Sequence, residues 1–396
     1  MMTRSLRLML CVLLAAMGPA SLAAAKPALV IDADSGRVLY AQEATHRWFP
    51  ASLTKLMTTY VVLNAVKQGR ISLDTPLVYT QRAQEEQPSK MGFPVGTVIT
   101  VENALKLLIV KSANDLAVTL AEGVGGNVET FVTEMNAVAR QLGMRESNFT
   151  NPNGWYDPLQ VTSARDMAIL ARAIYRDYPQ SAMLYKATGV QLGKRLIRGH
   201  NSLLGRFEGA DGMKTGFTCP SGFNLVASAQ RGQRRLIAVV MGEANAKERT
   251  QHAAQMLEAG FGSWTFWRTG QEVQTLASVA SEAPNMRAEI CEKKKVAPEA
   301  VGEVADNGEG DLVGAGPGAL KAGLTMSYTG DAQRPLLLEK PEPGPVLQGF
   351  LGPNPNGPPE FIALAERLAP PAPVIEKTAS GSDVPMPRPR PAKLTK

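Results

Sequence analysis

Two strand-rich segments enclose a helical block, and this order constrains the fold more than any other feature of the chain. Residues 28–32 and 37–40 flank Asp34-Ser35-Gly36, and residues 223–230 and 235–241 flank Arg231-Gly232, so each pair predicts a β-hairpin. Apolar residues at helical spacing predict helices over 101–111, 115–123, 127–142, 163–178 and 246–260. We therefore expect an α+β fold, in which the two ends supply an antiparallel sheet flanked by helices, with a helical subdomain between them.

Composition divides the chain into four parts. Residues 1–25 combine Arg4 and Arg7, a short apolar run and Ala23-Ala24-Ala25, the pattern of a secretory signal peptide. Residues 26–265 are rich in periodic apolar residues and predict one globular unit. Residues 266–342 predict a poorly defined extension, and the Pro-rich residues 343–396 predict a largely irregular, disordered tail with a short helix at 360–369. This pattern indicates an exported protein that is soluble or peripheral to the membrane.

Charge and metal-ligand patterns narrow the class of protein. The net charge is +6, and loss of Arg4 and Arg7 leaves +4, which fits a protein that works beside an anionic polymer. No basic-aromatic motif points to a nucleic acid partner. The histidines 46, 200 and 252 lack metal-ligand spacing, so we expect neither a metal nor another cofactor.

Two cysteines remain after the signal peptide is removed. Cys219 and Cys291 fall in different compositional regions of an exported chain. An oxidising compartment allows a disulfide between them, and two unpaired buried thiols are the alternative. We predict the disulfide, which would tie the extension to the globular unit.

Ser52 and Lys55 stand three residues apart at the predicted start of a helix. That spacing puts both side chains on one face. A serine hydroxyl becomes a good nucleophile when a neighbouring base accepts its proton, and a buried lysine kept neutral can do so. One Ser-x-x-Lys pattern is expected by chance in a chain of this length, so further motifs must select it.

Two other short motifs complete a set for acyl transfer. Ser112-Ala113-Asn114 lies between two predicted helices, and Lys214-Thr215-Gly216 leads toward the strand that begins near Phe223. Ser112 and Asn114 could pass a proton to a leaving group and bind a substrate amide, whereas Lys214 would lower the pKa of Lys55 and attract a carboxylate. The backbone N–H groups of Ser52 and Phe217 would form an oxyanion hole.

With these motifs, residues 26–262 resemble the low-molecular-mass penicillin-binding proteins that are serine D-alanyl-D-alanine carboxypeptidases. The resemblance implies a β-lactamase/transpeptidase-like fold. It implies that Ser52 is the nucleophile and that Lys55 is its base. It further implies that Ser112 and Asn114 form the second motif, and that Lys214, Thr215 and Gly216 form the third. The implied additional substrate contacts are Phe217, Thr218 and Arg249. Phe217 replaces a histidine that many members carry.

The resemblance also implies an activity and its partners. We expect a periplasmic enzyme that removes the terminal D-alanine from peptidoglycan stem peptides ending in D-Ala-D-Ala, with β-lactams as inhibitors. A DD-endopeptidase acting on crosslinks, a serine β-lactamase and a non-catalytic peptidoglycan-binding scaffold are the alternatives. No Glu-x-x-Leu-Asn segment lies between Leu142 and Asp166, which argues against a class A β-lactamase. The cations at 388, 390, 393 and 396 predict weak association of the tail with an anionic wall or membrane surface.

Overall fold

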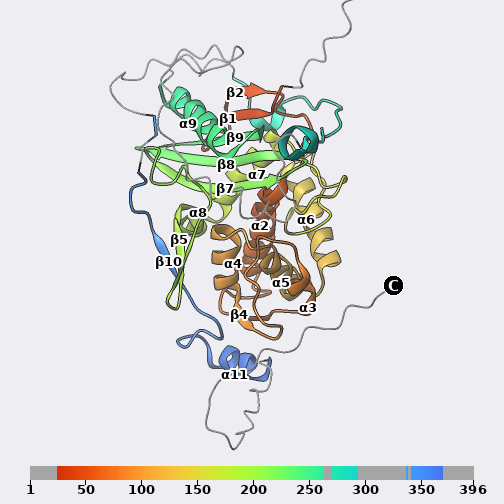
Figure 1. The fold of residues 1–396 in the computed structure, drawn as a ribbon, viewed down its shortest axis with the longest axis vertical. Coiled ribbons are helices and arrows are strands. Elements are labelled where there is room, and N and C mark those ends of the chain that lie inside the picture. Colours follow the sequence, from red (N-terminus) through yellow and green to blue (C-terminus); the bar gives the residue numbers. More distant parts are fainter. Residues whose placement is uncertain (1–24, 263–269, 293–335, 338–339, 369–396) are drawn as a thin grey trace, which may run out of the picture.

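The computed structural model describes residues 25–262, 270–292, 336–337 and 340–368 (Figure 1). The predicted signal peptide and the tail beyond Leu368 lie outside these residues. Within the described part of the chain, no helix is both long and apolar enough to cross a membrane.

The main sheet joins the two ends of the globular unit, as the sequence predicts. Its five antiparallel strands follow the order β2-β1-β9-β8-β7. Val30 of β1 pairs with Ala238 of β9, although some two hundred residues separate them. The strands are β1 (Ala28–Asp32), β2 (Val38–Gln42), β7 (Ala210–Thr218), β8 (Gly222–Arg231) and β9 (Arg234–Glu243). The Lys-Thr-Gly motif does more than lead into a strand, because it lies within edge strand β7 itself.

Helices cover both faces of this sheet (Figure 1). Side chains alternate along β1, so that Ala28 and Val30 pack in the cluster with α9 (Ala246–Gly262). Leu29 and Ile31 join the larger core that contains α7 (Ala164–Asp177). The sheet is thus buried on both sides, and its period of two is visible in the sequence.

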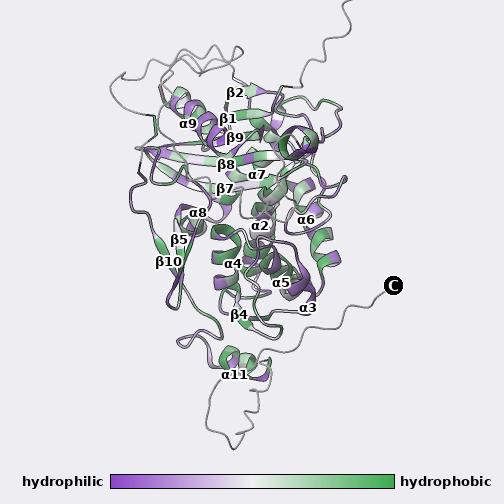
Figure 2. Ribbon diagram, viewed as in Figure 1, coloured by the Kyte–Doolittle hydropathy of each residue, from purple (hydrophilic) through white to green (hydrophobic). Residues whose placement is uncertain are grey.

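The helical subdomain lies beside the sheet, and its predicted helices form with small shifts of their ends. Asn127 and Ser163 cap α6 and α7 by accepting hydrogen bonds from the backbone N–H three residues ahead, and Gly143 ends α6 with φ 78°. Figure 2 shows largely hydrophobic colouring along α4 and α5, which are buried in the core. The subdomain contains α2 (Thr54–Lys67), β3 (Pro76–Val78), α3 (Gln81–Glu85), β4 (Val98–Thr100), α4 (Val101–Val110), α5 (Asn114–Gly125) and α6 (Val128–Leu142).

A small second sheet includes chain from beyond the globular unit. The hairpin β5 (Gly189–Leu192) and β6 (Arg195–Arg198) follows the short turn η2 (Pro179–Ser181) and helix α8 (Ala182–Lys186). Strand β10 (Val346–Gly349) then pairs in parallel with β5, and α11 (Pro359–Leu368) packs near β3 (Figure 1, blue). The prediction of a disordered tail from residue 343 is therefore corrected for residues 343–368. An exposed strand edge accepts any extended main chain, including a Pro-rich one, and composition does not reveal such pairing.

Residues 270–292, here called the clasp, also pack on the globular unit, contrary to the poorly defined extension expected there. Val273, in the turn η4 (Val273–Thr275), is buried beside α7, and the backbone N–H of Met286 donates to Pro220 O at 3.0 Å. The clasp ends in a π-helical turn, η5 (Ala288–Glu292), where Cys291 forms a disulfide with Cys219. The predicted disulfide is confirmed, and it joins the clasp to the end of β7.

Candidate active site

Ser52 lies in a 3₁₀ turn, η1 (Ala51–Leu53), that runs directly into α2. The helix begins near the predicted residue, although its first turn is 3₁₀. Ala51 has φ 49°, a left-handed conformation that costs energy for a residue with a Cβ. Asn224 of β8 donates to the carbonyl oxygens of Phe49 and Pro50 at 3.0 and 3.2 Å. The sheet therefore holds this strained turn and fixes the position of Ser52.

Lys55 is fully buried beside Ser52, and its Nζ lies 2.9 Å from Ser52 Oγ. Nζ is also 2.6 Å from two acceptors, Asn114 Oδ1 and the backbone oxygen of Asn153. Burial lowers the pKa of Lys55 well below its usual value, and the nearby charge of Lys214 lowers it further.

The hydrogen-bond geometry also suits a neutral Lys55 amine. A neutral amine has two N–H donors and one lone pair. Asn114 and Asn153 can accept the two N–H bonds, which leaves the lone pair for the proton of Ser52. Lys55 is thus placed to act as the base for Ser52.

The loop between α4 and α5 brings the second motif to the same point. Ser112 has φ 61° and is largely buried, and its Oγ accepts a hydrogen bond from Lys214 Nζ at 2.9 Å. Asn114 is the first residue of α5, and its Nδ2 donates to Gln87 O and Pro88 O at 2.9 and 3.2 Å. These bonds orient the amide so that its oxygen faces Lys55. Hydrogen bonds join Lys55 to Ser52 and Asn114, and another joins Lys214 to Ser112. The charge of Lys214 acts on Lys55, so the structure brings together the five residues that the sequence singled out.

Gly216 allows β7 to pass close to η1, which we call the nucleophile turn because it carries Ser52. A Cβ built at Gly216 would lie 2.9 Å from Pro50 O and 3.2 Å from Ser52 N, too close for any larger residue without a shift of the backbone. Lys214 and Thr215, just before it, are buried at 2% and 6% exposure. The two predicted oxyanion-hole donors, the N–H groups of Ser52 and Phe217, thus lie on two segments that Gly216 brings together.

Comparison with known proteins places this geometry in a family. The model of the family described as Peptidase_S11, D-alanyl-D-alanine carboxypeptidase, matches residues 15–245. The chain belongs to this family.

Individual relatives agree with that assignment. D-alanyl-D-alanine carboxypeptidase DacA of Haemophilus influenzae is 39% identical over 253 residues, which cover 62% of this chain and 64% of that protein. The match thus spans slightly less than two thirds of the relative's length. Crystal structures of penicillin-binding protein 5 from the same organism superpose with a TM-score of 0.58 at 39% identity, covering 60% of this chain and 71% of theirs. Penicillin-binding protein D2 of Listeria monocytogenes, in its cefotaxime-bound form, gives a TM-score of 0.55 at 29% identity and covers 60% and 97%.

Three residues that the family resemblance implies as substrate contacts make other contacts within the protein. Arg249 of α9 is buried, 5.9 Å from the ring centre of Phe223, which packs against Phe217 with ring centres 4.1 Å apart. Thr218 forms hydrogen bonds with Ser221 in the turn that follows β7. Contacts of Phe217, Thr218 and Arg249 with substrate stay predictions.

Other residues of the site escaped the sequence analysis. The Asn153 carbonyl contacts Lys55, and Asn153 Nδ2 donates to Glu86 at 2.7 Å, where burial raises the pKa of the Glu86 carboxyl. Gly154 follows with φ 88°, and a Cβ there would overlap Ala51 O. The turn signature Asn151-Pro152-Asn153-Gly154 was the available signal, but it indicates only a turn. Among the described residues, no cluster of His, Cys, Asp and Glu is suited to hold a metal.

Proposed function

We propose that this chain is an exported, periplasmic serine DD-carboxypeptidase that removes the terminal D-alanine from peptidoglycan stem peptides. The observation that carries the proposal is the buried Lys55 amine, 2.9 Å from Ser52 Oγ and connected through Asn114 to the second motif. The family membership supports the same activity.

The geometry supports the following course for the proposed reaction. Ser52 Oγ attacks the carbonyl carbon of the penultimate D-alanine while its proton moves to Lys55 Nζ. The carbonyl oxygen becomes an oxyanion that backbone N–H groups at Ser52 and Phe217 stabilise. When the C–N bond breaks, the departing nitrogen takes a proton from Ser112, which regains one through its hydrogen bond with Lys214. Water then attacks the carbonyl carbon of the Ser52 ester and passes a proton through Ser112 back to Lys214. The C–O bond to Ser52 breaks, Ser52 Oγ takes back the proton held on Lys55 Nζ, and the stem peptide leaves one residue shorter.

β-Lactam antibiotics fit the same site as covalent inhibitors, because their strained amide offers Ser52 the same kind of carbonyl. The cefotaxime-bound form of the Listeria relative supports this expectation.

A class A β-lactamase mechanism receives no support from the 142–166 segment. The Glu146 carboxylate accepts hydrogen bonds from Ser163, Arg165 and Ser278, so its oxygens are occupied away from Ser52.

The direct test is release of D-alanine from a soluble pentapeptide ending in D-Ala-D-Ala. We expect turnover by the full chain and none by Ser52→Ala. No D-alanine release by a full chain that is folded and labelled by penicillin would refute the carboxypeptidase proposal.

We further propose that the cations beyond Leu368 give weak, salt-sensitive association with an anionic wall or membrane surface. Because residues 343–368 pack on the catalytic unit, the chain should be cut after Leu368 to test this. We expect unchanged turnover of a soluble pentapeptide and weaker, less salt-sensitive binding to isolated sacculi and to anionic lipid vesicles. Undiminished binding to both surfaces after this cut would contradict the proposal.

A further inference from the structure

The proposed proton transfer from Ser112 sets the side of Ser52 on which the leaving group lies. The attacked carbonyl sits over Ser52, and the departing nitrogen must reach Ser112 to receive a proton. Lys214 Nζ donates to Ser112 Oγ at 2.9 Å, so the leaving residue extends from Ser52 toward Lys214. A cavity beside Lys214 is therefore where the leaving group would be received.

A cavity of about 450 Å³ lies against this part of β7. Lys214 and Thr215 of β7 line it, together with Lys247 at the start of α9 and Ile109 and Val110 at the end of α4. Arg198, His200 and Arg206 also line the cavity. Among the described lining residues, Glu342 is the one that bears a carboxylate. Such a cavity suits one amino-acid residue with a free carboxylate and its water.

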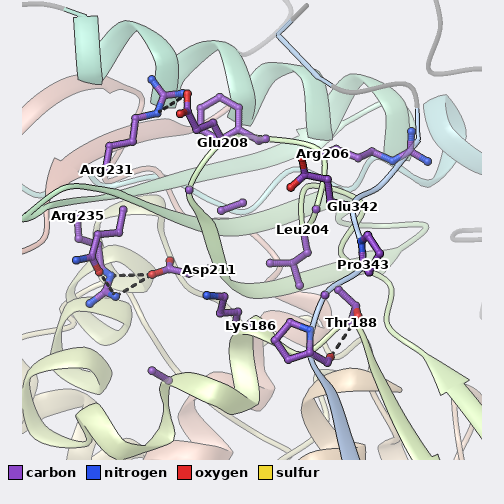
Figure 3. A pocket seen from close by; sticks show the side chains of 18 of the residues that line it. Lys186, Thr188, Leu204, Arg206, Glu208, Asp211, Arg231, Arg235, Glu342 and Pro343 are labelled. Carbon is purple, nitrogen blue, oxygen red and sulfur yellow. Dashed lines mark hydrogen bonds and ion pairs between the residues drawn. The ribbon is translucent and has the colours of Figure 1, made fainter.

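The outer wall of this leaving-group cavity comes from the far end of the chain. We call residues 341–354 the strap; five of its residues line the cavity, namely Pro341, Glu342, Pro343, Gly344 and Val346. The strap descends along the outside of β5 toward the helical subdomain (Figure 1, blue). Near its start it also borders a larger hollow, in which Arg235 pairs with Asp211 and Arg231 with Glu208 (Figure 3).

Hydrogen bonds fix the strap on both sides of the cavity. Glu342 N donates to Gly205 O at 2.7 Å. Thr188 donates through N and Oγ1 to Pro345 O at 2.8 and 3.2 Å (Figure 3, dashed line at Thr188). Farther along, Lys106 Nζ donates to Gln348 O at 2.8 Å.

The strap continues onto the helical subdomain. Gly352 N donates to Val98 O, and Asn354 Nδ2 to Asp74 Oδ1, each at 2.8 Å. The strap is therefore bound to both halves of the molecule that enclose the site.

Close packing holds the same wall in place. A Cβ built at Gly344 would lie 2.3 Å from Thr188 Cγ2. Thr188 cannot rotate away freely, because its hydroxyl bonds to Pro345 O. Prolines 341, 343 and 345 restrict the backbone here, so this wall is stiff.

The two peptidase reactions place different demands on this side. In carboxypeptidase cleavage the leaving group is one D-alanine. In cleavage of a crosslink, the leaving amine belongs to the side chain of a second stem peptide, which continues to its own glycan strand. A crosslink therefore needs an open path beyond Lys214, at the place where the strap crosses.

We propose that the strap determines specificity: it makes the enzyme an exopeptidase by closing the leaving-group cavity to crosslinked peptides. This inference rests on the DD-carboxypeptidase activity proposed above and names its substrate class, a stem peptide with a single C-terminal residue to release.

The experiment compares two substrates with four variants of the full chain. The substrates are a pentapeptide ending in D-Ala-D-Ala and a purified crosslinked dimer of stem peptides carrying their disaccharides. One variant ends after Lys340 and lacks the strap, and its control ends after Leu368 and keeps it. Gly344→Val displaces the strap within the intact chain, and its size-matched control is Gly262→Val, where a Cβ meets no atom within 4 Å.

We expect the full chain to cleave the pentapeptide and to leave the dimer nearly intact. The ratio of dimer cleavage to pentapeptide cleavage should rise about tenfold or more in both strap variants and stay unchanged in both controls. Labelling with a fluorescent penicillin reports an intact Ser52 site, and if the shortened chain fails to label, Gly344→Val decides the outcome.

Two results would overturn the role of the strap. One is a full chain that cleaves the dimer as fast as the pentapeptide. The other is an unchanged ratio in strap variants that still bind penicillin stoichiometrically. The pentapeptide reaction of the full chain tests the proposed activity separately, so failure of the activity is distinguishable from failure of the strap.

Discussion

Adding one methyl group at Gly216 should slow acylation while leaving the fold intact. The Cβ of Gly216→Ala would lie 2.9 Å from Pro50 O, 3.1 Å from Leu53 N and 3.2 Å from Ser52 N, all backbone atoms that cannot rotate away. Relief to ordinary contact distance requires β7 and the nucleophile turn to separate by about 0.5 Å. These two segments carry the two predicted oxyanion donors, and loss of one donor costs about 10²–10³-fold in kcat. Because the displacement is partial, we expect the rate constant of acylation to fall by about 10- to 100-fold.

The assay measures the rate constant of acylation by a fluorescent penicillin and the release of D-alanine from a pentapeptide, with the melting temperature as a check on folding. Gly262→Ala is the matched control, because its new Cβ meets no atom within 4 Å. We expect the control to acylate at the rate of the unmodified chain. If Gly216→Ala does so too, the close approach of β7 to Ser52 has no catalytic role and our reading of the oxyanion hole fails.

Three further predictions concern the base, a buried acid and the disulfide. Lys55→Ala should slow acylation by about 10²–10⁴-fold, and a near-normal rate in stopped-flow labelling would eliminate Lys55 as the base. Burial and the charge of Glu146 raise the pKa of Asp166 to about 7, so the folded state holds a proton that the unfolded state has released. The stability that this bound proton contributes is greatest at acid pH and is lost as the pH rises from about 4 to 7. In urea unfolding measured across this range, Asp166→Asn should make the free energy of unfolding depend less on pH. An unchanged pH dependence in Asp166→Asn would contradict the raised pKa of Asp166. The Cys219–Cys291 disulfide spans 72 residues, so Cys291→Ser should lower the free energy of unfolding by about 3–4 kcal/mol; an unchanged urea midpoint would show that the clasp is held without it.

Much of the site was predictable because its chemistry lies in side chains at fixed spacing. Ser52 and Lys55 meet because a helical start places residues three apart on one face. Lys214 meets Ser112 across 102 residues of sequence, and it was the set of three motifs and its family resemblance that implied this contact. Helix ends were predictable for the same reason, since the caps at Asn127 and Ser163 are local hydrogen bonds.

The unpredicted parts rely on main-chain groups and on contacts distant in sequence. The carbonyl of Asn153 accepts from Lys55, yet every residue has a carbonyl, so no residue type marks this one. Asn224 supports the nucleophile turn from 174 residues away. The strap pairs with β5 through main-chain bonds, and its Pro-rich sequence is equally compatible with an unpaired chain. Composition therefore indicated an extended segment correctly but could not show what it pairs with.

The central claim is that Ser52 is the nucleophile and that Lys55 activates it. The most direct test is peptide mapping of the full chain after brief reaction with a penicillin, followed by trypsin digestion and mass spectrometry. We predict one covalent penicillin adduct, on the tryptic peptide Trp48–Lys55, that is lost entirely in Ser52→Ala. An adduct on any other peptide, or one that persists in Ser52→Ala, would contradict the claim.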